Sequence, residues 1–214
     1  MKILFLSPHK HLTEFLNSFG DEVVQYTEPL SKRITRDDGE KVDVITEATQ
    51  EILKNIDFIV SYSYRFKICK EIAQMFDKRV INAHISFLPY NRGADPNFWS
   101  IAEDTPNGVS IHYVDGNIDT GDFICKDGRI TRQEVPVLVE TDTLRTLRNR
   151  VDEAMEKMFI EWWPLIRLGE VGSMPQLTYH WVKDRDDHLD LLPFGWDTPI
   201  KDVLGKVKTT HYRC

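Results

Sequence analysis

The feature of this sequence that most restricts its fold is the alternation of strand-like and helix-like runs before residue 85. KILFL at 2–6, DFIVSYSY at 57–64 and RVINAH at 79–84 are compact and apolar, which is typical of buried strands. HLTEFLNSF at 11–19 and KICKEIAQMF at 67–76 instead space their apolar residues as an amphipathic helix does. Strands that alternate with helices in this way favour a parallel, doubly wound sheet.

The rest of the chain predicts further elements. EVVQY at 22–26 is expected to be a strand, and the polar residues 28–42 a surface excursion before a helix at 45–56. GVSIHYV at 108–114 alternates as a strand does, and the turn after it leads into another strand. Apolar residues three or four apart predict a long helix over 141–168. The sequence therefore predicts an α/β fold with a doubly wound, mostly parallel, Rossmann-like sheet.

The end of the chain is less regular. QLTYHWVKD at 176–184 suggests a strand, and residues 191–207 suggest a turn and a short helix. No repeat or low-complexity linker interrupts the sequence. The simplest division is one domain over 1–170 and a short C-terminal extension over 171–214 packed on it.

Composition excludes several classes of protein. With 214 residues, 41% hydrophobic and 29% charged, the chain is an ordinary soluble protein, and a net charge of -7 without a Lys/Arg block disfavours nucleic-acid binding. The apolar run at the N-terminus is too short for a signal peptide or a membrane span. Three cysteines without a CxxC pair indicate neither disulfides nor zinc. We expect a cytoplasmic protein with no metal, nucleic-acid or membrane partner.

Polar side chains stand where the predicted strands end. Asn82 and His84 close the strand at 79–84, and Asp119 ends the turn after the strand at 108–114. Ligands of doubly wound sheets bind outside the carboxyl ends of the strands, so these three residues form a candidate site. An Asn-x-His at a strand end can equally cap a turn, and that alternative stays open.

These residue types suit the transfer of an acyl group to an amine. Asn82 can donate its amide N–H to a developing oxyanion, and His84 can do the same or take up a proton near neutral pH. Asp119 can orient His84 and hold a water that relays protons. No Ser or Cys nucleophile is required, and Cys125 is expected to be a core residue.

Neighbouring residues allow two other interpretations. DGNIDTGD at 115–122 resembles the start of a calcium-binding EF-hand loop, but its glycine comes one position late and Lys126 stands where Glu is required. Calcium is therefore disfavoured. His112 is expected to be a structural strand residue rather than a second base.

Two linked motifs carry a resemblance to a known family. NAHISFLPYNRGADPNFWSI at 82–101, followed by GVSIHYVDGNIDTGDFI at 108–124, resembles the folate-dependent formyltransferases, whose signature pairs Asn-x-His and a Ser-x-Leu-Pro loop with an Asp-x-Gly turn. The resemblance implies that Asn82, His84 and Asp119 are catalytic and that N10-formyltetrahydrofolate is the formyl donor. By order of elements it covers residues 1 to about 168.

The resemblance also implies a folate site. In the family the pterin ring binds main-chain groups of two segments, which match Tyr64, Arg65 and Phe66 and, further on, Asp115, Gly116 and Asn117, while Gly121 lets the backbone turn close to the donor. Asp122 departs from the family, which often has Pro there, and an extra acid beside the site can alter the pKa of Asp119.

The acceptor amine is inferred from the segments that accompany these motifs. Glycinamide ribonucleotide formyltransferases have a Gly-Ser-Gly-type phosphate loop where this chain has SPHK at 7–10. Methionyl-tRNA formyltransferases share the RGADP loop at 92–96 but add a β-barrel domain and a basic tRNA surface. The tail segments at 178–184 and 195–203 are similar to those of the sugar N-formyltransferases. The resemblance thus implies formylation of a dTDP- or GDP-linked amino-dideoxy sugar for a surface polysaccharide such as the lipopolysaccharide O-antigen.

Candidate residues for binding the nucleotide sugar lie in three segments. His9 and Lys10 begin the first predicted helix, where cations and backbone N–H groups attract phosphate. The others are Pro89, Arg92 and Gly93 in the loop and Tyr179 in the tail. Lys10 can also be a solvated surface charge, and Tyr179 and Trp181 can be packing residues. The apolar tail is compatible with a homodimer.

Four other functions remain alternatives. The chain can be a glycinamide ribonucleotide or methionyl-tRNA formyltransferase, or a hydrolase of the same donor. It can also be a non-enzymatic module that binds folate or a nucleotide sugar, although the complete Asn, His and Asp set argues against that.

Overall fold

The computed structural model describes residues 1–176 and 185–208. The chain divides into two compact units. The first comprises Met1–Ala83 and Tyr113–Asn117, and the second comprises His84–His112 and Ile118–Cys214. The division of the chain into domains at residue 170 stays a prediction.

The first unit is built on a parallel sheet in the order β6 (Val80–His84), β5 (Phe58–Tyr62), β1 (Lys2–Leu6) and β2 (Glu22–Tyr26). Every residue of β5 is buried, as is β1 after its first residue. Strands covered on both faces are expected to be continuously apolar, which is why these runs were recognisable in the sequence.

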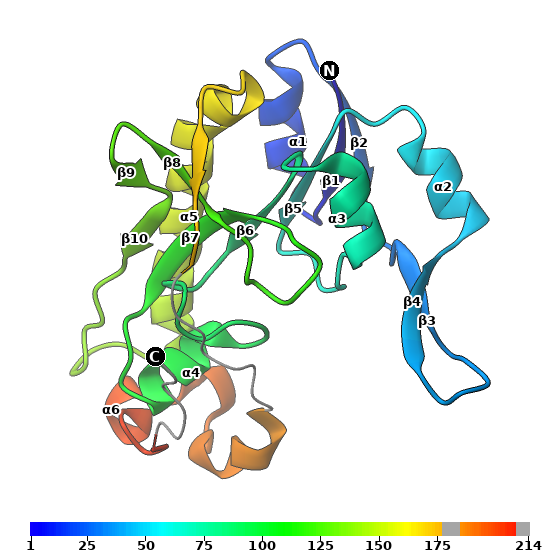
Figure 1. Ribbon diagram of the computed structural model, residues 1–214. Helices are drawn as coiled ribbons and strands as arrows, with labels where there is room; N and C mark the ends of the chain where they lie inside the picture. The colour runs from blue at the N-terminus through cyan, green and yellow to red at the C-terminus, as the bar shows by residue number, and fades with distance from the viewer. Residues whose placement is uncertain (177–184, 209–214) are drawn as a thin grey trace. The chain divides into compact units, whose positions relative to one another are not determined.

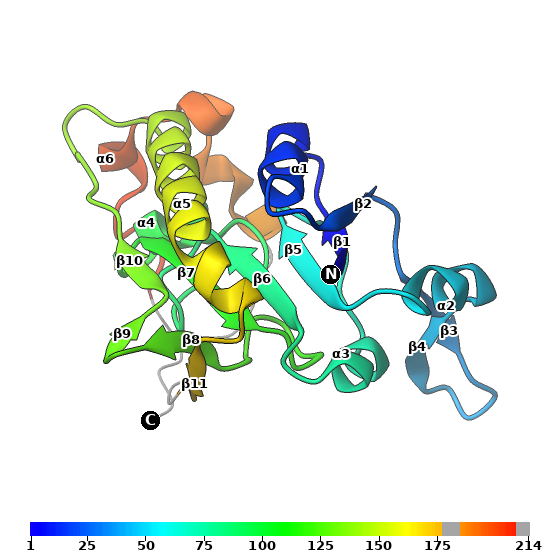
Figure 2. The ribbon, with the colours of Figure 1, turned by 90° about the horizontal axis from the view of Figure 1, so that it is seen from above.

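Helices cover both faces of this sheet. Helix α1 (Lys10–Asn17) joins β1 to β2, and α3 (Lys70–Phe76) joins β5 to β6. Because β2 and β6 lie on opposite sides of the β1–β5 pair, right-handed crossovers place the two helices on opposite faces. Figure 2 shows this arrangement. The predicted doubly wound, Rossmann-like class is thereby confirmed.

One part of the first unit differs from the sequence prediction. Residues expected as an irregular excursion contain an antiparallel hairpin of β3 (Ser31–Thr35) and β4 (Lys41–Ile45), turning through Gly39 at φ 85°. It forms a separate two-stranded arm beside α2 (Glu47–Leu53) (Figure 1). Strand β3 is polar and almost wholly exposed, and no residue of β4 is buried, so the hairpin lacks the compact apolar run by which buried strands are found.

The second unit contains antiparallel strands. Strand β8 (Phe123–Lys126) pairs with β7 (Gly108–Tyr113), β9 (Arg129–Ile130) and β11 (Gly172–Met174), while β10 (Arg132–Glu134) pairs with β7. The sequence predicted β7 and β8 but not the three short strands. Strands of two or three residues carry no readable period.

The long helix expected over 141–168 is confirmed as α5 (Leu144–Arg167). Thr143 caps it, accepting from the Thr146 N–H, and the Thr146 side chain bonds back to the Thr143 backbone in a capping box. Its buried face consists of Leu144, Leu147, Val151, Met155, Met158, Phe159, Trp162, Trp163 and Ile166.

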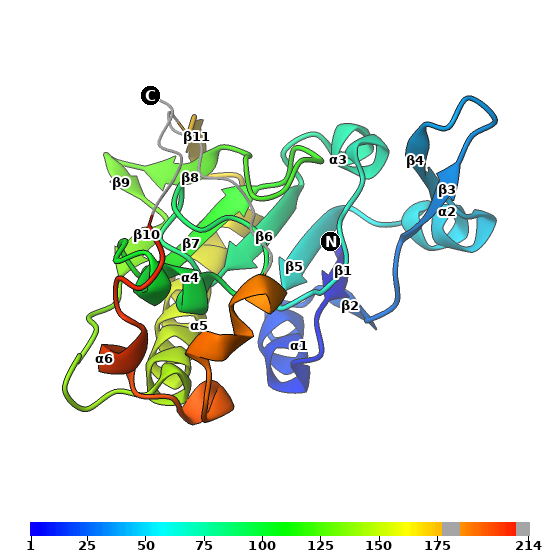
Figure 3. The ribbon, with the colours of Figure 1, turned by 90° about the horizontal axis from the view of Figure 1, so that it is seen from below.

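Short helices surround one end of α5. Helix α4 (Pro96–Ala102) and the 3-10 turn η2 (Gly195–Asp197) contact α5, and α6 (Ile200–Val203) contacts α4 (Figure 3). A further 3-10 segment, η1, spans Arg185–Leu191. The turn and short helix expected over 191–207 are confirmed. The strand expected at 176–184 lies almost wholly outside the described residues, as does Trp181. None of the described helices is long and apolar enough to cross a membrane.

Candidate active site

Asn82 and His84 lie at the end of β6, two residues apart. Side chains separated by two residues in a strand point to the same face, so both belong to one face of β6. Asn82 is opposite Ser61 of β5, whose hydroxyl donates to Asn82 Oδ1 at 2.8 Å. Because the amide oxygen accepts this bond, the NH₂ group is the donor end of Asn82.

His84 is buried, with 8% of its surface exposed. The chain turns immediately after it, since the Ser86 N–H donates to the His84 carbonyl at 2.8 Å. Its Nε2 atom lies 3.5 Å from Asp119 Oδ2 and makes no hydrogen bond within the described residues. A buried ring nitrogen that faces a carboxylate in this way is poised to bind or exchange a proton.

Asp119 lies in a tight turn at φ 52°, in the left-handed region. Its Oδ2 accepts from the Gly93 N–H at 2.8 Å, and its Oδ1 lies 3.3 Å from His112 Nε2. The carboxylate is therefore shared by two imidazoles and a backbone amide. His112 is a buried strand residue, as expected, but its contact with Asp119 was not anticipated by any motif.

Near neutral pH one of the two central groups is charged and the other is not. Burial alone would raise the pKa of Asp119, but the imidazoles of His84 and His112 and the Gly93 N–H together lower that pKa well below its usual range. Burial lowers the pKa of His84, and the Asp119 charge only partly offsets this. Asp119 is thus ionised and His84 neutral, so His84 can act as both proton acceptor and N–H donor.

We expect His84 to make the fold less stable in acid. Its pKa in the folded chain lies below the ordinary 6.5, so the unfolded chain binds a proton near pH 6.5 that the folded chain does not. Stability is therefore lost as the pH falls below 6.5. Thermal unfolding at pH 7.5 and 5.5 should show a decrease in Tm for the wild type that is about 2–4 °C larger than for His84→Gln. Equal decreases in the two proteins would contradict the assignment.

The loop after β6 is fixed by hydrogen bonds within the second unit. Ser110 Oγ donates to the Ser86 carbonyl at 2.8 Å and accepts from the Leu88 N–H at 3.1 Å. Arg132 donates to the Leu88 carbonyl at 2.8 Å. Pro89, a predicted substrate contact, follows a cis peptide bond in this loop.

Arg92 and Gly93, also predicted to contact the substrate, continue the same loop. Gly93 has φ 90°, which only glycine adopts readily, and its N–H is the one bound by Asp119. Arg92 is buried and donates to Gln176 Oε1 at 2.5 Å. Gln176 was not among the predicted site residues, because it lies outside the two linked motifs and before the tail segment at 178–184.

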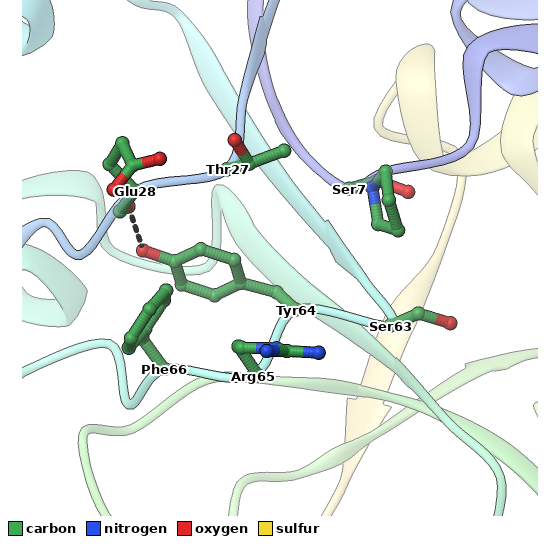
Figure 4. Close-up of a pocket in the computed structure, with 8 residues that line it drawn as sticks. Ser7, Thr27, Glu28, Ser63, Tyr64, Arg65 and Phe66 are labelled. Atoms are coloured by element: carbon green, nitrogen blue, oxygen red, sulfur yellow. Dashed lines mark hydrogen bonds between the residues drawn. The ribbon is translucent and has the colours of Figure 1, made fainter.

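A cavity of about 310 Å³ lies within the first unit. Its lining includes the three predicted folate-binding residues Tyr64, Arg65 and Phe66, and the others are Ser7, Pro8, Thr27, Glu28 and Ser63. The Tyr64 hydroxyl donates to the Glu28 carbonyl at 2.6 Å, and burial raises the pKa of Tyr64 (Figure 4). The ring of Phe66 packs edge-on against Tyr64 at 5.5 Å. The cavity has an aromatic wall and a polar rim.

His9 is attached to one of the residues that line this cavity. Its Nε2 lies 3.3 Å from Ser63 Oγ, and its ring packs against Tyr62. His9 is the N-cap of α1, and the exposed Lys10 is the first helical residue. Both therefore lie at a helix N-terminus, which favours anions.

The second predicted folate segment is also in the first unit. Gly116 has φ 90°, and a Cβ atom there would lie 2.4 Å from Lys70 Cα, so only glycine fits. The Asn117 N–H donates to Asp115 Oδ1 at 2.9 Å, which rigidifies the turn. Gly121 lies in the second unit, where its carbonyl accepts from Gln176. Tyr179 lies outside the described residues.

The chain contains groups suited to proton transfer and oxyanion binding. A neutral buried imidazole beside an ionised carboxylate, on the strand that also carries an oriented amide donor, suits addition of a nucleophile to a carbonyl. Among residues 1–176 and 185–208 there is no group of three His, Cys, Asp or Glu side chains arranged to hold a metal ion.

Sequence comparison identifies the class of protein. The family described as Formyl transferase matches residues 22–162, well over half of the chain. This chain belongs to the formyl transferase family, and the family predicted from the two motifs is confirmed.

One solved structure resembles it over almost all of both chains. It is the formyltransferase PseJ from Anoxybacillus kamchatkensis, in complex with UDP-4,6-dideoxy-4-formamido-L-AltNAc and tetrahydrofolate. The two sequences are 45% identical, with a TM-score of 0.79, and the match covers 96% of this chain and 99% of PseJ.

More distant structures share the fold. A sugar N-formyltransferase from Shewanella sp. FDAARGOS_354 is 19% identical, with a TM-score of 0.71, over 98% of this chain and 89% of its own. An N-formyltransferase from Helicobacter canadensis, in complex with folinic acid and dTDP-3-aminofucose, is 17% identical, with a TM-score of 0.63, over 94% and 79%.

The curated relatives of this chain include methionyl-tRNA formyltransferases. That of Geobacillus sp. (strain WCH70) is 29% identical over 161 residues, which is 72% of this chain and 47% of the relative. That of Fusobacterium nucleatum is 35% identical over 121 residues, which is 56% of this chain and 37% of the relative. The chain thus spans about half the length, or less, of the curated relatives it matches.

Proposed function

We propose that this protein transfers a formyl group from N10-formyltetrahydrofolate to the amino group of a nucleotide-linked amino-dideoxy sugar. The observation that carries the proposal is the 45% identity to PseJ over nearly the whole of both chains, because the PseJ complex contains tetrahydrofolate and a formamido sugar on UDP. The carrier expected from sequence was dTDP or GDP. The likeness to PseJ favours UDP and an amine at position 4 of the sugar.

Three side chains have defined tasks in this reaction. As the neutral amine adds to the formyl carbon, the NH₂ group of Asn82 and the N–H of His84 donate to the oxyanion that forms. The amine gives its proton to His84, and the protonated His84 returns a proton to the folate nitrogen when the bond between that nitrogen and the formyl carbon breaks. Asp119, ionised and 3.5 Å from His84, stabilises positive charge on the imidazole during this proton transfer.

The same proposal assigns the binding residues. Main-chain groups of Tyr64–Phe66 and Asp115–Asn117, with Gly121, hold the folate. The nucleotide sugar contacts His9, Lys10, Pro89, Arg92, Gly93 and Tyr179. The aromatic wall of the cavity formed by Tyr64 and Phe66 supports this assignment, since pockets for small ligands are mostly apolar with a few placed polar groups.

The test is a formylation assay with defined acceptors. The purified protein is incubated with N10-formyltetrahydrofolate and UDP-, dTDP- or GDP-linked 4-amino or 3-amino sugars, and mass spectrometry follows the gain of one formyl group. We expect a UDP-linked 4-amino sugar to be formylated fastest. Formylation of glycinamide ribonucleotide or methionyl-tRNA instead would overturn the proposal, and decay of the donor to formate alone would indicate a hydrolase.

Removing the charge of Lys10 should weaken binding of the sugar nucleotide. Lys10→Met is expected to raise the KM for the acceptor about tenfold and to leave kcat within about twofold, because a charge-assisted hydrogen bond to phosphate contributes roughly 1.5–3 kcal/mol. Steady-state kinetics at fixed folate measure both constants. Lys41→Met, at an exposed position on β4, is the matched control. A wild-type KM in Lys10→Met would show that Lys10 is only a solvated charge.

A further inference from the structure

We propose that Gln176 is a positioning residue of the active site, which fixes the turn that carries Asp119. The expected loss of activity rests on the proposed function, whereas the expected displacement of the Asp119 carboxylate does not. It assigns a role to a residue of the predicted C-terminal extension, outside the two motifs of the family.

The sheet register brings Gln176 to this turn. Strand β11 pairs antiparallel with β8, so that Gly172 faces Cys125 and Met174 faces Phe123. Continuing this register by two residues places Gln176 opposite Gly121, two residues after Asp119. Gln176 is 7% exposed.

The side-chain amide of Gln176 connects the loop that contains Arg92 with the turn that contains Asp119. Its Nε2 donates to the carbonyls of Gly121 at 2.7 Å and of Asp119 at 3.1 Å. Its Oε1 accepts from the Arg92 guanidinium at 2.5 Å. Both protons and the oxygen of the amide are therefore used.

These bonds close a ring around the catalytic carboxylate. Arg92 precedes Gly93, and the Gly93 N–H donates to Asp119 Oδ2 at 2.8 Å. Gln176 thus bonds to Asp119, at one end of the Gly93–Asp119 hydrogen bond, and to the side chain of Arg92, which precedes the residue at the other end. Asp119 adopts φ 52°, which is unfavourable for a residue with a side chain and persists only where the surroundings impose it. The two bonds from Nε2 supply that constraint at the turn itself.

A positioning role makes a specific prediction for variants. Gln176→Met keeps the size of the side chain and removes all its hydrogen bonds. Gln176→Glu keeps the size and the acceptor for Arg92 but cannot, when ionised, donate to the carbonyls of Asp119 and Gly121. If Gln176 acts through the Asp119 turn, both variants should displace the carboxylate from His84 and His112. If it only provides the hydrogen-bond acceptor for the buried Arg92, Gln176→Glu should resemble the wild type.

Imidazole ¹⁵N NMR measures the displacement without requiring activity. The Nε2 shifts of His84 and His112 report on the Asp119 carboxylate, and the hydrogen bonds of Gln176 to Arg92, Asp119 and Gly121 involve neither ring. We expect Gln176→Met and Gln176→Glu to move both shifts toward their values in Asp119→Asn. Adding Gln176→Met to Asp119→Asn should move them no further. Gln74→Met, at an exposed position on α3, is the matched control and should leave them unchanged.

Kinetics then test the consequence for catalysis. Both Gln176 variants should lose about 10- to 100-fold in kcat with KM values within about threefold, since misplacing a catalytic group by about 1 Å can cost 10²-fold. The proposal would be overturned if folded Gln176→Glu kept the wild-type imidazole shifts. It would also be overturned if Gln176→Met changed the shifts as much in the Asp119→Asn variant as in the wild type. If the shifts change but no sugar is formylated by any variant or by the wild type, the proposed function fails and the positioning role stands.

Discussion

Replacing His84 by alanine, or Asn82 by alanine, should lower kcat for formyl transfer by about 10²–10³-fold in each variant. In the proposed mechanism each substitution removes a donor to the oxyanion at the end of β6, and His84→Ala also removes the group proposed to exchange the proton. The KM values should change much less, because these contacts strengthen only as the oxyanion forms.

The control for these variants must separate catalysis from folding. Asn55→Ala, at an exposed position just after α2, should keep wild-type kcat. Circular dichroism and the midpoint of thermal unfolding should show Asn82→Ala and His84→Ala to be folded at the assay temperature. A folded variant of either residue with wild-type kcat would remove that residue from the site.

Replacing Asp119 by asparagine should have an effect on kcat on the order of 10²–10⁴-fold. Asparagine has nearly the same shape and can still accept from the Gly93 N–H, but it carries no charge to stabilise a protonated His84. Asp119→Asn therefore tests the effect of the charge alone, whereas Asp119→Ala would also leave the Gly93 N–H without its acceptor. Single-turnover experiments with saturating folate and sugar measure the loss in the chemical step directly.

The same variant should also change how stability depends on pH. The interactions with His84, His112 and Gly93 lower the pKa of Asp119 in the folded chain below its ordinary 3.8. The stability they provide is present above the unfolded pKa and is lost as the pH falls through the folded value. Urea unfolding should therefore show a flatter decline between pH 5 and 3 for Asp119→Asn than for the wild type. Parallel curves would mean that the carboxylate has an ordinary pKa in the folded chain.

Buried elements were predictable from the sequence because burial imposes a pattern. Strands β1, β5 and β6 are covered on both faces and appear as apolar runs, and the apolar stripe of α5 appears as residues three or four apart. The β3–β4 hairpin was not predicted, since its strands are exposed and are defined by pairing with each other.

The candidate site likewise contains contacts that were predictable from the sequence and contacts that were not. His84 and Asp119 were expected to be close because each ends an element next to the sheet, and the structure places Nε2 and Oδ2 3.5 Å apart. The contact of His112 with Asp119 and the bonds of Gln176 depend on pairing between segments far apart in sequence. A strand as short as β11 does not reveal its register in one sequence.

The antiparallel pairing of β8 with β11 affects where two members of the family can be joined in a chimeric protein. The match to the family ends at residue 162, inside α5, so the end of this helix is an obvious place to join the family domain to the tail of a relative. Yet the hydrogen bonds that reach the Asp119 turn come from Gln176, beyond that apparent boundary. A chimera joined directly after α5 would replace Gln176 and, with it, the hydrogen bonds to the Asp119 turn. A junction placed after residue 176 would keep the Asp119 turn and Gln176 within the sequence of one parent protein.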